Sequence, residues 1–337
     1  MKYRYKAFGI DSPDLHSMGD SLFQYLEIKM HQLITKENPS KILVMGKYDR
    51  ENSVIADCEK NNKMFNFHRP TANIDEQGNV TVYCYPGRDY VRHYASLIQT
   101  YMNINKRDVL VEYDLPSEEF CSQTIENSNF NDIPVSDVAI VGFALDKFTD
   151  NQWTDGSPYL WATDQLKNHS VTYVGCHYSY WSDAGGRFVY HLAKKGFKRI
   201  IYVGKLGAIQ PEIVPNEYVT TGNMSSMEDE IVTWKNVFEN VELPNLIHGQ
   251  HCNCPGVVME TKEWLARHSQ YHFVDSELGQ MAKFAQAAGV EFSYFHFVSD
   301  NVVKKYDEDL SNERIEEIIQ KRKAIIHTIK EVLYNME

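Results

Sequence analysis

The chain has 337 residues, 43% of them hydrophobic and 24% charged, a composition typical of a globular protein with a sizeable core. Its formal net charge of −12 disfavours nonspecific binding to nucleic acid or anionic membranes, because both need clustered positive charge. No stretch approaches the roughly 20 apolar residues of a membrane helix, the basic N-terminus lacks the apolar run of a secretory signal, and the six cysteines are scattered. We therefore expect a cytoplasmic protein that binds neither nucleic acid nor membrane.

The first 130 residues alternate apolar segments of helical and strand character. Helical spacing and short apolar runs predict a helix over 21–34, a strand over 42–45, a strand over 80–85, a helix over 90–102 and a strand over 108–113. The segment 116–134 is polar and turn-rich, which predicts a boundary. We therefore expect residues 1–130 to form an N-terminal extension, with its contribution to the first strands of the core left open, and residues 131–337 to form that core.

The pattern of residues 131–337 predicts an α/β domain. The predicted elements are strands over 138–142, 171–175 and 200–204, a helix from 183 to before 196, a helix over 278–288, a strand over 292–298 and a helix over 312–334. Near-continuous apolar strands are typical of a sheet covered on both faces. Ligands of such folds bind at the carboxyl ends of the strands, where the pattern places Gly46, Gly142, Gly175, Gly204 and Asp300.

Two carboxylates stand in positions that can support cleavage of a glycosidic bond. Val274–Glu277 opens a small-residue helix with an acid, and Val298–Asp300 ends a strand with a second one. One acid can hold a sugar while the other protonates a leaving group. Together with the strand-and-glycine segment Gly196–Ile209, these motifs resemble the purine nucleoside and uridine phosphorylases, a superfamily that also holds the AMP and methylthioadenosine nucleosidases. Order and spacing agree from Val171 to Tyr334.

The resemblance implies a three-layer α/β fold, a central mixed sheet flanked by helices, and roles for particular residues. Glu277 corresponds to the glutamate that holds the ribose hydroxyls, Asp300 to the aspartate that protonates a purine, and Arg314 to an arginine that assists it. Substrate contacts implied by position are Ser276, Ser299, Cys252 and Gly207. The anion-binding candidates are Gly204, Lys205, Arg50 and Arg187. Members of the superfamily commonly assemble so that subunits complete one another's pockets, which implies a homo-oligomer.

This sequence departs from the phosphorylase pattern at the phosphate site. Tyr202 stands where those enzymes place an arginine, and Lys205 stands where they place a serine or threonine. Ser276 replaces the usual methionine, and Gly46–Arg50 takes the place of the phosphate-binding loop in an altered form. The resemblance therefore implies that phosphate recognition is either lost or rebuilt around Lys205.

The expected activity is phosphorolysis of the N-glycosidic bond of a nucleoside or nucleotide, with a preference for purines and with inorganic phosphate as co-substrate. Hydrolysis by water, a nucleotide-binding module without turnover, and transfer onto an unusual sugar stay open. Each residue also has a structural alternative: Asp300 as a turn residue, Glu277 as a first-turn acid, Lys205 as a solvated surface charge. We expect no cofactor. A metal site is disfavoured because the cysteine and histidine spacing lacks a second distant pair; the residues concerned are His248, His251, Cys252 and Cys254.

Overall fold

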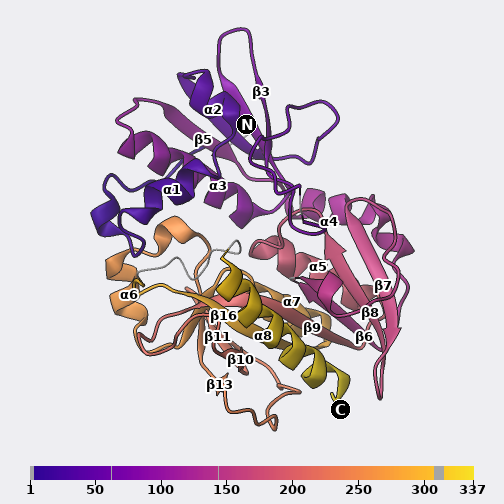
Figure 1. The fold of residues 1–337 in the computed structure, drawn as a ribbon. Coiled ribbons are helices and arrows are strands. Elements are labelled where there is room, and N and C mark those ends of the chain that lie inside the picture. The colour runs from indigo at the N-terminus through magenta and orange to yellow at the C-terminus, as the bar shows by residue number, and fades with distance from the viewer. Residues whose placement is uncertain (1–3, 62, 143, 307–314) are drawn as a thin grey trace.

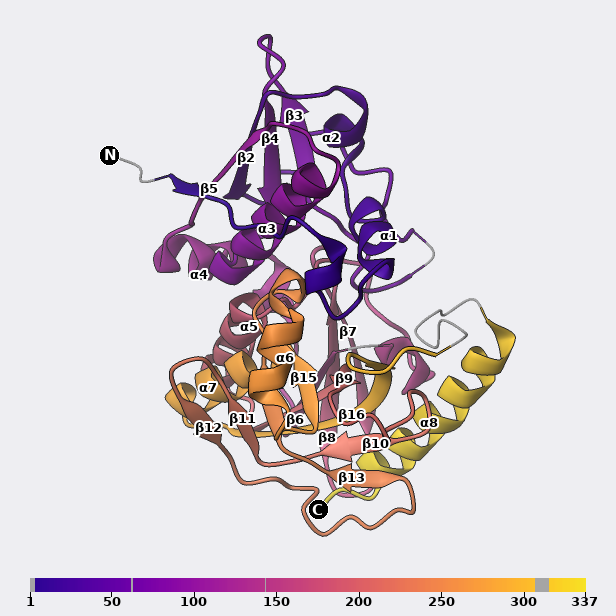
Figure 2. The ribbon, with the colours of Figure 1, turned by 90° about the vertical axis from the view of Figure 1, so that its left-hand side faces the viewer.

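The computed structural model describes residues 4–61, 63–142, 144–306 and 315–337 (Figure 1). The chain builds two sheets, each with helices of its own, and the smaller sheet lies above the larger one in Figure 2. Within the described ranges, none of the helices combines the length and apolar character needed to cross a bilayer.

The smaller sheet has the order β1-β5-β2-β4-β3. Its strands are β1 (Tyr5–Lys6), β2 (Lys41–Gly46), β3 (Thr71–Ile74), β4 (Val80–Cys84) and β5 (Leu110–Asp114). β2 pairs in parallel with both β4 and β5, and the two edge strands run antiparallel to their neighbours. These early strands therefore pair among themselves and not with the larger sheet.

Four helices accompany the smaller sheet, and three of them differ from the sequence-based expectation. They are α1 (Ser21–Glu27), α2 (Gln32–Lys36), α3 (Arg88–Ile104) and α4 (Glu118–Glu126). The continuous helix predicted over 21–34 is wrong, because His31 leaves helical geometry and its Nδ1 accepts a hydrogen bond from the Leu33 N–H, which starts α2. Within the segment predicted to be turns, Ser117 caps α4 by accepting from the Phe120 N–H at 3.1 Å.

The larger sheet is mixed and centres on β9. Its strands are β6 (Val138–Gly142), β7 (Tyr159–Gln165), β8 (Ser170–Cys176), β9 (Arg199–Ala208), β10 (Val219–Thr221), β11 (Met224–Ser226), β12 (Ile231–Thr233), β13 (Leu246–His248), β14 (His251–Asn253), β15 (Phe273–Asp275) and β16 (Glu291–Asn301). The order is β12-β11-β14-β15-β9-β16-β10-β13, and β6, β8 and β7 extend from the first half of β9. β6 and β16 both run parallel to β9.

Helices cover both faces of this sheet, so the predicted three-layer α/β fold is confirmed. α5 (Asp183–Lys195) and α7 (Leu278–Ala288) pack on one face, and α8 (Glu316–Tyr334) packs on the other. Each face of the sheet packs against its helices in a hydrophobic core, and alternate residues of β9 belong to the two cores. Ile200 and Tyr202 lie in the first, and Ile201 and Val203 lie in the second. This alternation follows from the period of two in a strand and explains why the sequence of β9 is apolar almost throughout.

The carboxyl ends of the two sheets face each other. Tyr85, which follows β4, stacks on Tyr178, which follows β8, with ring centroids 3.5 Å apart and planes 6° apart. The Asp183 carboxylate at the start of α5 accepts hydrogen bonds from the N–H groups of Arg88 and Asp89 at 2.8 and 3.1 Å. A side chain of the larger unit thus satisfies the first turn of α3 in the smaller unit. The loops that follow parallel strands in both units meet at this junction.

Replacing Asp183 with alanine removes the cap that joins the two units. We expect Asp183→Ala to lower the free energy of unfolding by about 1–2 kcal/mol, the range for loss of a helix N-cap. Urea unfolding of the full chain measures it, with Asp150→Ala, at an exposed position, as the matched control. Equal midpoints for the two variants would contradict the assignment.

Candidate active site

Gly207 of β9 lies at the centre of the predicted site. It is paired on one side with Val274 of β15 and on the other with Asp300 of β16. An irregularity between Val298 and Asp300 shifts the register by one residue, which turns the end of β16. A Cβ atom at position 207 would stand 3.1 Å from Asp300 Oδ2. Glycine therefore leaves the space in which the Asp300 carboxylate lies beside β9.

The second predicted carboxylate enters from the other side of β9. Asp275 ends β15, and its Oδ1 accepts hydrogen bonds from the N–H groups of Glu277 and Leu278 at 3.0 and 2.9 Å, which caps α7. This cap fixes Glu277 at the N-terminus of the helix. Burial, followed by the charge of Asp275, raises the pKa of Glu277 from 4.5 to about 8. Glu277 and Asp300 thus follow the two strands that pair with Gly207, and the roles that the resemblance implies for them stay predictions.

The structure adds a third carboxylate that the sequence analysis missed. Glu260 lies between the 3-10 turn Val257–Met259 and α6 (Lys262–His268) and is partly accessible. Burial, followed by the charge of Asp300, raises its pKa from 4.5 to about 8. We call Glu260, Glu277 and Asp300 the acidic cluster. Nothing in the sequence around Glu260 marks it, because it is a lone acid in an irregular segment.

Tyr25 of α1 connects the acidic cluster to the smaller unit. Burial raises the pKa of this phenol, and the charges of Glu260 and Glu277 raise it further, while the charge of Arg69 lowers it. Tyr25 therefore lies within electrostatic reach of both carboxylates from the larger unit and of an arginine from the smaller one. The site consequently includes residues of both units.

The charges of cations from both units act on Lys29, which follows α1. Burial lowers the pKa of Lys29 from 10.5 to about 7, and the charges of Arg69, Lys60 and Lys205 lower it further, in that order. Lys205 lies in β9 directly after Gly204, and Lys60 and Arg69 lie in the segment between β2 and β3. We call Lys29, Lys60, Arg69 and Lys205 the basic cluster. Of its members, the sequence analysis found Lys205 alone.

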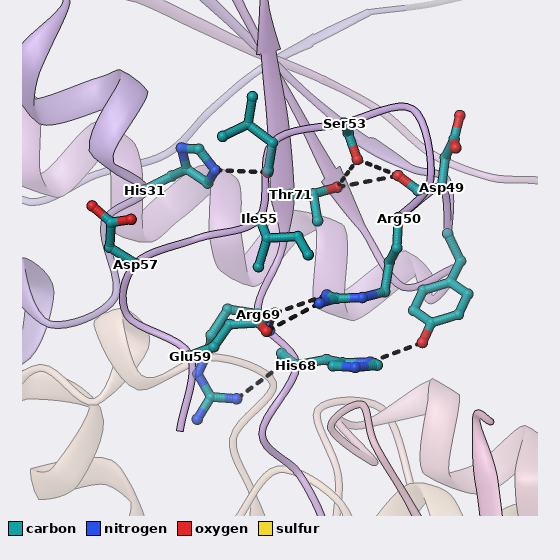
Figure 3. A network of polar contacts seen from close by, with 12 residues as sticks. His31, Asp49, Arg50, Ser53, Ile55, Asp57, Glu59, His68, Arg69 and Thr71 are labelled. Carbon is teal, nitrogen blue, oxygen red and sulfur yellow. Dashed lines mark hydrogen bonds and ion pairs between the residues drawn. The ribbon is translucent and has the colours of Figure 1, made fainter. Parts of the chain in front are cut away.

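A small cavity opens where the carboxyl ends of the two sheets meet. It is lined from the smaller unit by Lys47, Tyr48, Asp49, Arg50, His68, Arg69, Pro70, Thr71, Tyr83, Tyr85 and Tyr90, and from the larger unit by Tyr178. Arg50, an anion-binding candidate, forms two hydrogen bonds with the Glu59 carboxylate at 2.8 and 3.0 Å. Figure 3 shows this pair, and it shows the guanidinium of Arg69 pointing away from it. Arg50 thus has an internal partner.

The remaining predicted residues lie in different surroundings. Arg187 is buried in α5, with Nη2 2.6 Å from Glu118 and 3.4 Å from Asp183, contacts that indicate a structural role. Cys252 is fully buried in β14 within an apolar cluster, and Ser276 is buried directly before Glu277. Ser299 donates a hydrogen bond to Asp300. Arg314 lies outside the described residues.

The arrangement places carboxyl groups that can support acid chemistry within electrostatic reach of cations. Protonated carboxyls can donate a proton to a leaving group, and ionised ones can hold hydroxyls. In the ranges that the structure describes, no group of three or more histidine, cysteine or acidic residues is arranged to hold a metal ion. The titratable groups at the junction are carboxylates, cations, His68 and several tyrosines.

Comparisons with known proteins place the chain among similar folds. No family model matches it. The protein named "Oxidoreductase cns1" from Cordyceps militaris is 24% identical over 256 residues, which are 66% of this chain and 32% of that protein. This chain therefore aligns with about a third of that relative's length.

Solved structures similar to this chain are nucleosidases and nucleoside phosphorylases. The 5'-methylthioadenosine/S-adenosyl homocysteine nucleosidase of Campylobacter jejuni is 13% identical with a TM-score of 0.46, covering 60% of this chain and 100% of its own. The uridine phosphorylase of Vibrio fischeri is 12% identical with a TM-score of 0.48, covering 59% and 91%. These are members of the superfamily that the motifs resemble. At such scores we base no statement about substrate on them.

The raised pKa of Glu260 makes stability depend on pH. The folded protein keeps a proton that the unfolded chain releases above pH 4.5, so this contribution is complete below that pH and is lost as the pH rises through about 8. We expect the free energy of unfolding of Glu260→Gln, which cannot ionise, to fall less than that of the unchanged protein between about pH 5 and about pH 8. Glu263→Gln, at an exposed position of α6, is the control. Identical pH profiles for all three proteins would be evidence against a Glu260 that keeps its proton in the folded protein at neutral pH.

Proposed function

We propose that this protein cleaves the N-glycosidic bond of a nucleoside or nucleotide. The observation that carries the proposal is the position of Glu277 and Asp300 on either side of Gly207, at the carboxyl end of the central strand. A substrate between them meets one acid at its sugar and the other at its base.

In this proposal Asp300 protonates the departing base. Cleavage builds positive charge on the sugar and negative charge on the base, so a positioned acid lowers the barrier. Glu277 accepts hydrogen bonds from the ribose hydroxyls, and its ionised form accepts two of them. Because the pKa of Glu277 is raised to about 8, substrate binding improves as the pH approaches that value.

Phosphate is the nucleophile that the basic cluster favours. Lys205 replaces the serine or threonine of related phosphorylases, and the charges of Lys205, Lys29 and Arg69 act on the same region. A dianion bound there is stabilised by several cations at once. Arg314 as a helper, a preference for purines, assembly as a homo-oligomer and a cytoplasmic location stay predictions.

Hydrolysis is the second candidate, and Glu260 favours it. Glu260 lies within electrostatic reach of Asp300, and its pKa of about 8 is close to that of an effective general base near neutral pH. In this version Glu260 takes a proton from water, which attacks the sugar carbon while Asp300 protonates the base. The two candidates share Asp300 and Glu277 and differ in the nucleophile.

Product analysis on purine and pyrimidine nucleosides and nucleotides, with and without inorganic phosphate, tests the proposal. Free base with sugar 1-phosphate, formed only when phosphate is present, identifies a phosphorylase. Free base with free sugar, independent of phosphate, identifies a nucleosidase. Detectable binding with no release of base from any substrate would contradict the proposed function and favour a nucleotide-binding module.

Replacing Asp300 tests whether this residue acts as the general acid or only supports the structure. We expect Asp300→Asn to lower kcat by about 10²–10⁴-fold, the usual contribution of general acid catalysis, with little effect on KM. Asp229→Asn, at an exposed position, keeps full activity as the matched control. Turnover by Asp300→Asn within a few-fold of the unchanged protein would rule out the acid role.

Glu277→Gln tests the contact with the sugar. The amide keeps the size of the side chain but loses an acceptor, so we expect weaker binding of ribonucleosides by about tenfold or more, the usual cost of losing a hydrogen bond to a charged group. The loss is expected to be smaller for 2'-deoxyribonucleosides, which lack one hydroxyl. Isothermal titration with both sugars measures the difference, and equal losses for both would contradict the assignment.

A further inference from the structure

Three neighbouring strands of the larger sheet, β11, β14 and β15, carry a row of polar side chains on one face. Ser225 of β11 pairs directly with His251 of β14. His251 in turn pairs with Phe273 of β15, so Asp275, two residues further along that strand, points to the same face. Ser225 and His251 are fully buried, and the side chain of Asp275 is 6% exposed. A buried polar row of this kind needs internal hydrogen bonds.

His251 joins the members of this row to one another. Its Nδ1 lies 2.8 Å from Ser225 Oγ, and its Nε2 accepts a hydrogen bond from the Asp275 N–H at 3.0 Å. Because Nε2 is the acceptor, the neutral ring carries its proton on Nδ1 and donates it to the Ser225 hydroxyl. The same Nε2 lies 3.1 Å from Asp275 Oδ1, to which a protonated ring would donate instead. In either form the imidazole holds Asp275 in place.

Asp275 passes this restraint to the start of α7. Its Oδ1 accepts hydrogen bonds from the N–H groups of Glu277 and Leu278 at 3.0 and 2.9 Å. Its Oδ2 is buried and has no hydrogen-bond partner among the described residues. Because one oxygen makes these contacts, rotation of the carboxylate would release Glu277, and the ring of His251 beside that oxygen restricts the rotation.

The first turn of α7 packs directly on the polar row. A Cβ atom at position 279 would stand 2.8 Å from Ser225 Oγ and 3.0 Å from Asn253 Oδ1. Glycine at this position lets the helix backbone approach the strands closely. The start of α7, and with it Glu277, is therefore held against the strands that carry Ser225, His251 and Asp275.

We propose that His251 is a positioning residue: it orients the Asp275 carboxylate, which in turn fixes Glu277 for contact with the sugar. Ser225 supports this role by holding the ring of His251 at its other nitrogen. The inference rests on the proposed function, because the contact with the sugar is the role proposed there for Glu277. His251 is fully buried, so it acts on the sugar only through Asp275 and Glu277.

Two replacements of His251 separate the roles of its two nitrogens. The amide of glutamine reaches about as far as Nε2 and that of asparagine about as far as Nδ1, so His251→Gln keeps a group beside Asp275 and His251→Asn does not. Isothermal titration with adenosine, uridine and their 2'-deoxy forms compares the variants. We expect His251→Asn to weaken ribonucleoside binding by up to about tenfold, the loss expected for Glu277→Gln, and to weaken 2'-deoxyribonucleoside binding less. His251→Gln should retain most of the affinity, and His191→Asn, at a buried position of α5, is the matched control.

A double-mutant cycle shows whether the effect of His251 passes through Glu277. Adding His251→Asn to Glu277→Gln should change ribonucleoside affinity by less than about twofold, because the contact is already lost. Additive losses in the double variant, or equal losses for the two sugars in His251→Asn, would overturn the inference. Because His251 is buried, unfolding midpoints check that each variant is folded. Ser225→Ala, which keeps the histidine, should show the same preferential loss of ribonucleoside binding in a weaker form.

Amide hydrogen exchange keeps this inference separate from the proposed function, because it needs no substrate. The N–H groups of Glu277 and Leu278 donate to Asp275, and we expect them to exchange up to about fivefold faster in His251→Asn, the factor for loss of a helix cap. Their exchange should stay unchanged in His251→Gln. Faster exchange in a protein that releases no base from any nucleoside would support the positioning role and contradict glycosidic cleavage. Base release by the unchanged protein, with unchanged exchange in His251→Asn, would support cleavage and contradict the positioning role.

Discussion

The junction between the carboxyl ends of two sheets is the constraint on which the rest of the structure depends. The loops that follow parallel strands lie at the carboxyl ends of those strands. In this protein the carboxyl ends of the two sheets face each other. The Asp183 carboxylate caps α3 across the junction, and Tyr85 stacks on Tyr178. These contacts bring the smaller unit's cations to the same place as the larger unit's carboxylates. Neither unit contains the whole arrangement.

The junction holds both acids and cations, and for several of them the folded protein disfavours the charged form. Burial and neighbouring charges raise the pKa values of Glu260 and Glu277 to about 8 and lower that of Lys29 to about 7. Groups whose ionisation is disfavoured in the free protein gain most from a ligand that supplies hydroxyls to the acids and negative charge to the bases. These disfavoured charges lower the stability of the free protein, and contacts with a bound substrate of that kind offset the loss.

Apolar periodicity and motif spacing predicted the central strands of the fold. The short strands, α4 and several charged residues of the site could not be predicted, because they lie in segments without a regular pattern. β9 and β16 were predictable because long apolar runs between two helical layers leave little choice. The short strands β10 to β14 have three residues each, too few for a pattern. α4 was missed because its sequence is largely polar, and its cap at Ser117 is the clearest indication of it. Glu277 and Asp300 stood in motifs, whereas Glu260, Lys29 and Arg69 are lone charges that only the packing of two units brings together.

The N-terminal unit contributes charged side chains to the junction in addition to a sheet of its own. A sheet that merely shielded the core would place apolar side chains at the junction, since burying unpaired charge is costly. Instead it presents Arg69 with two open nitrogens and Lys29 beside it, opposite the carboxylates of the larger unit. Arg69 lines the cavity between the units, where its open nitrogens still reach solvent and so avoid the full cost of burying a charge. The smaller unit thus supplies positive charge to the junction, and the larger unit supplies negative charge.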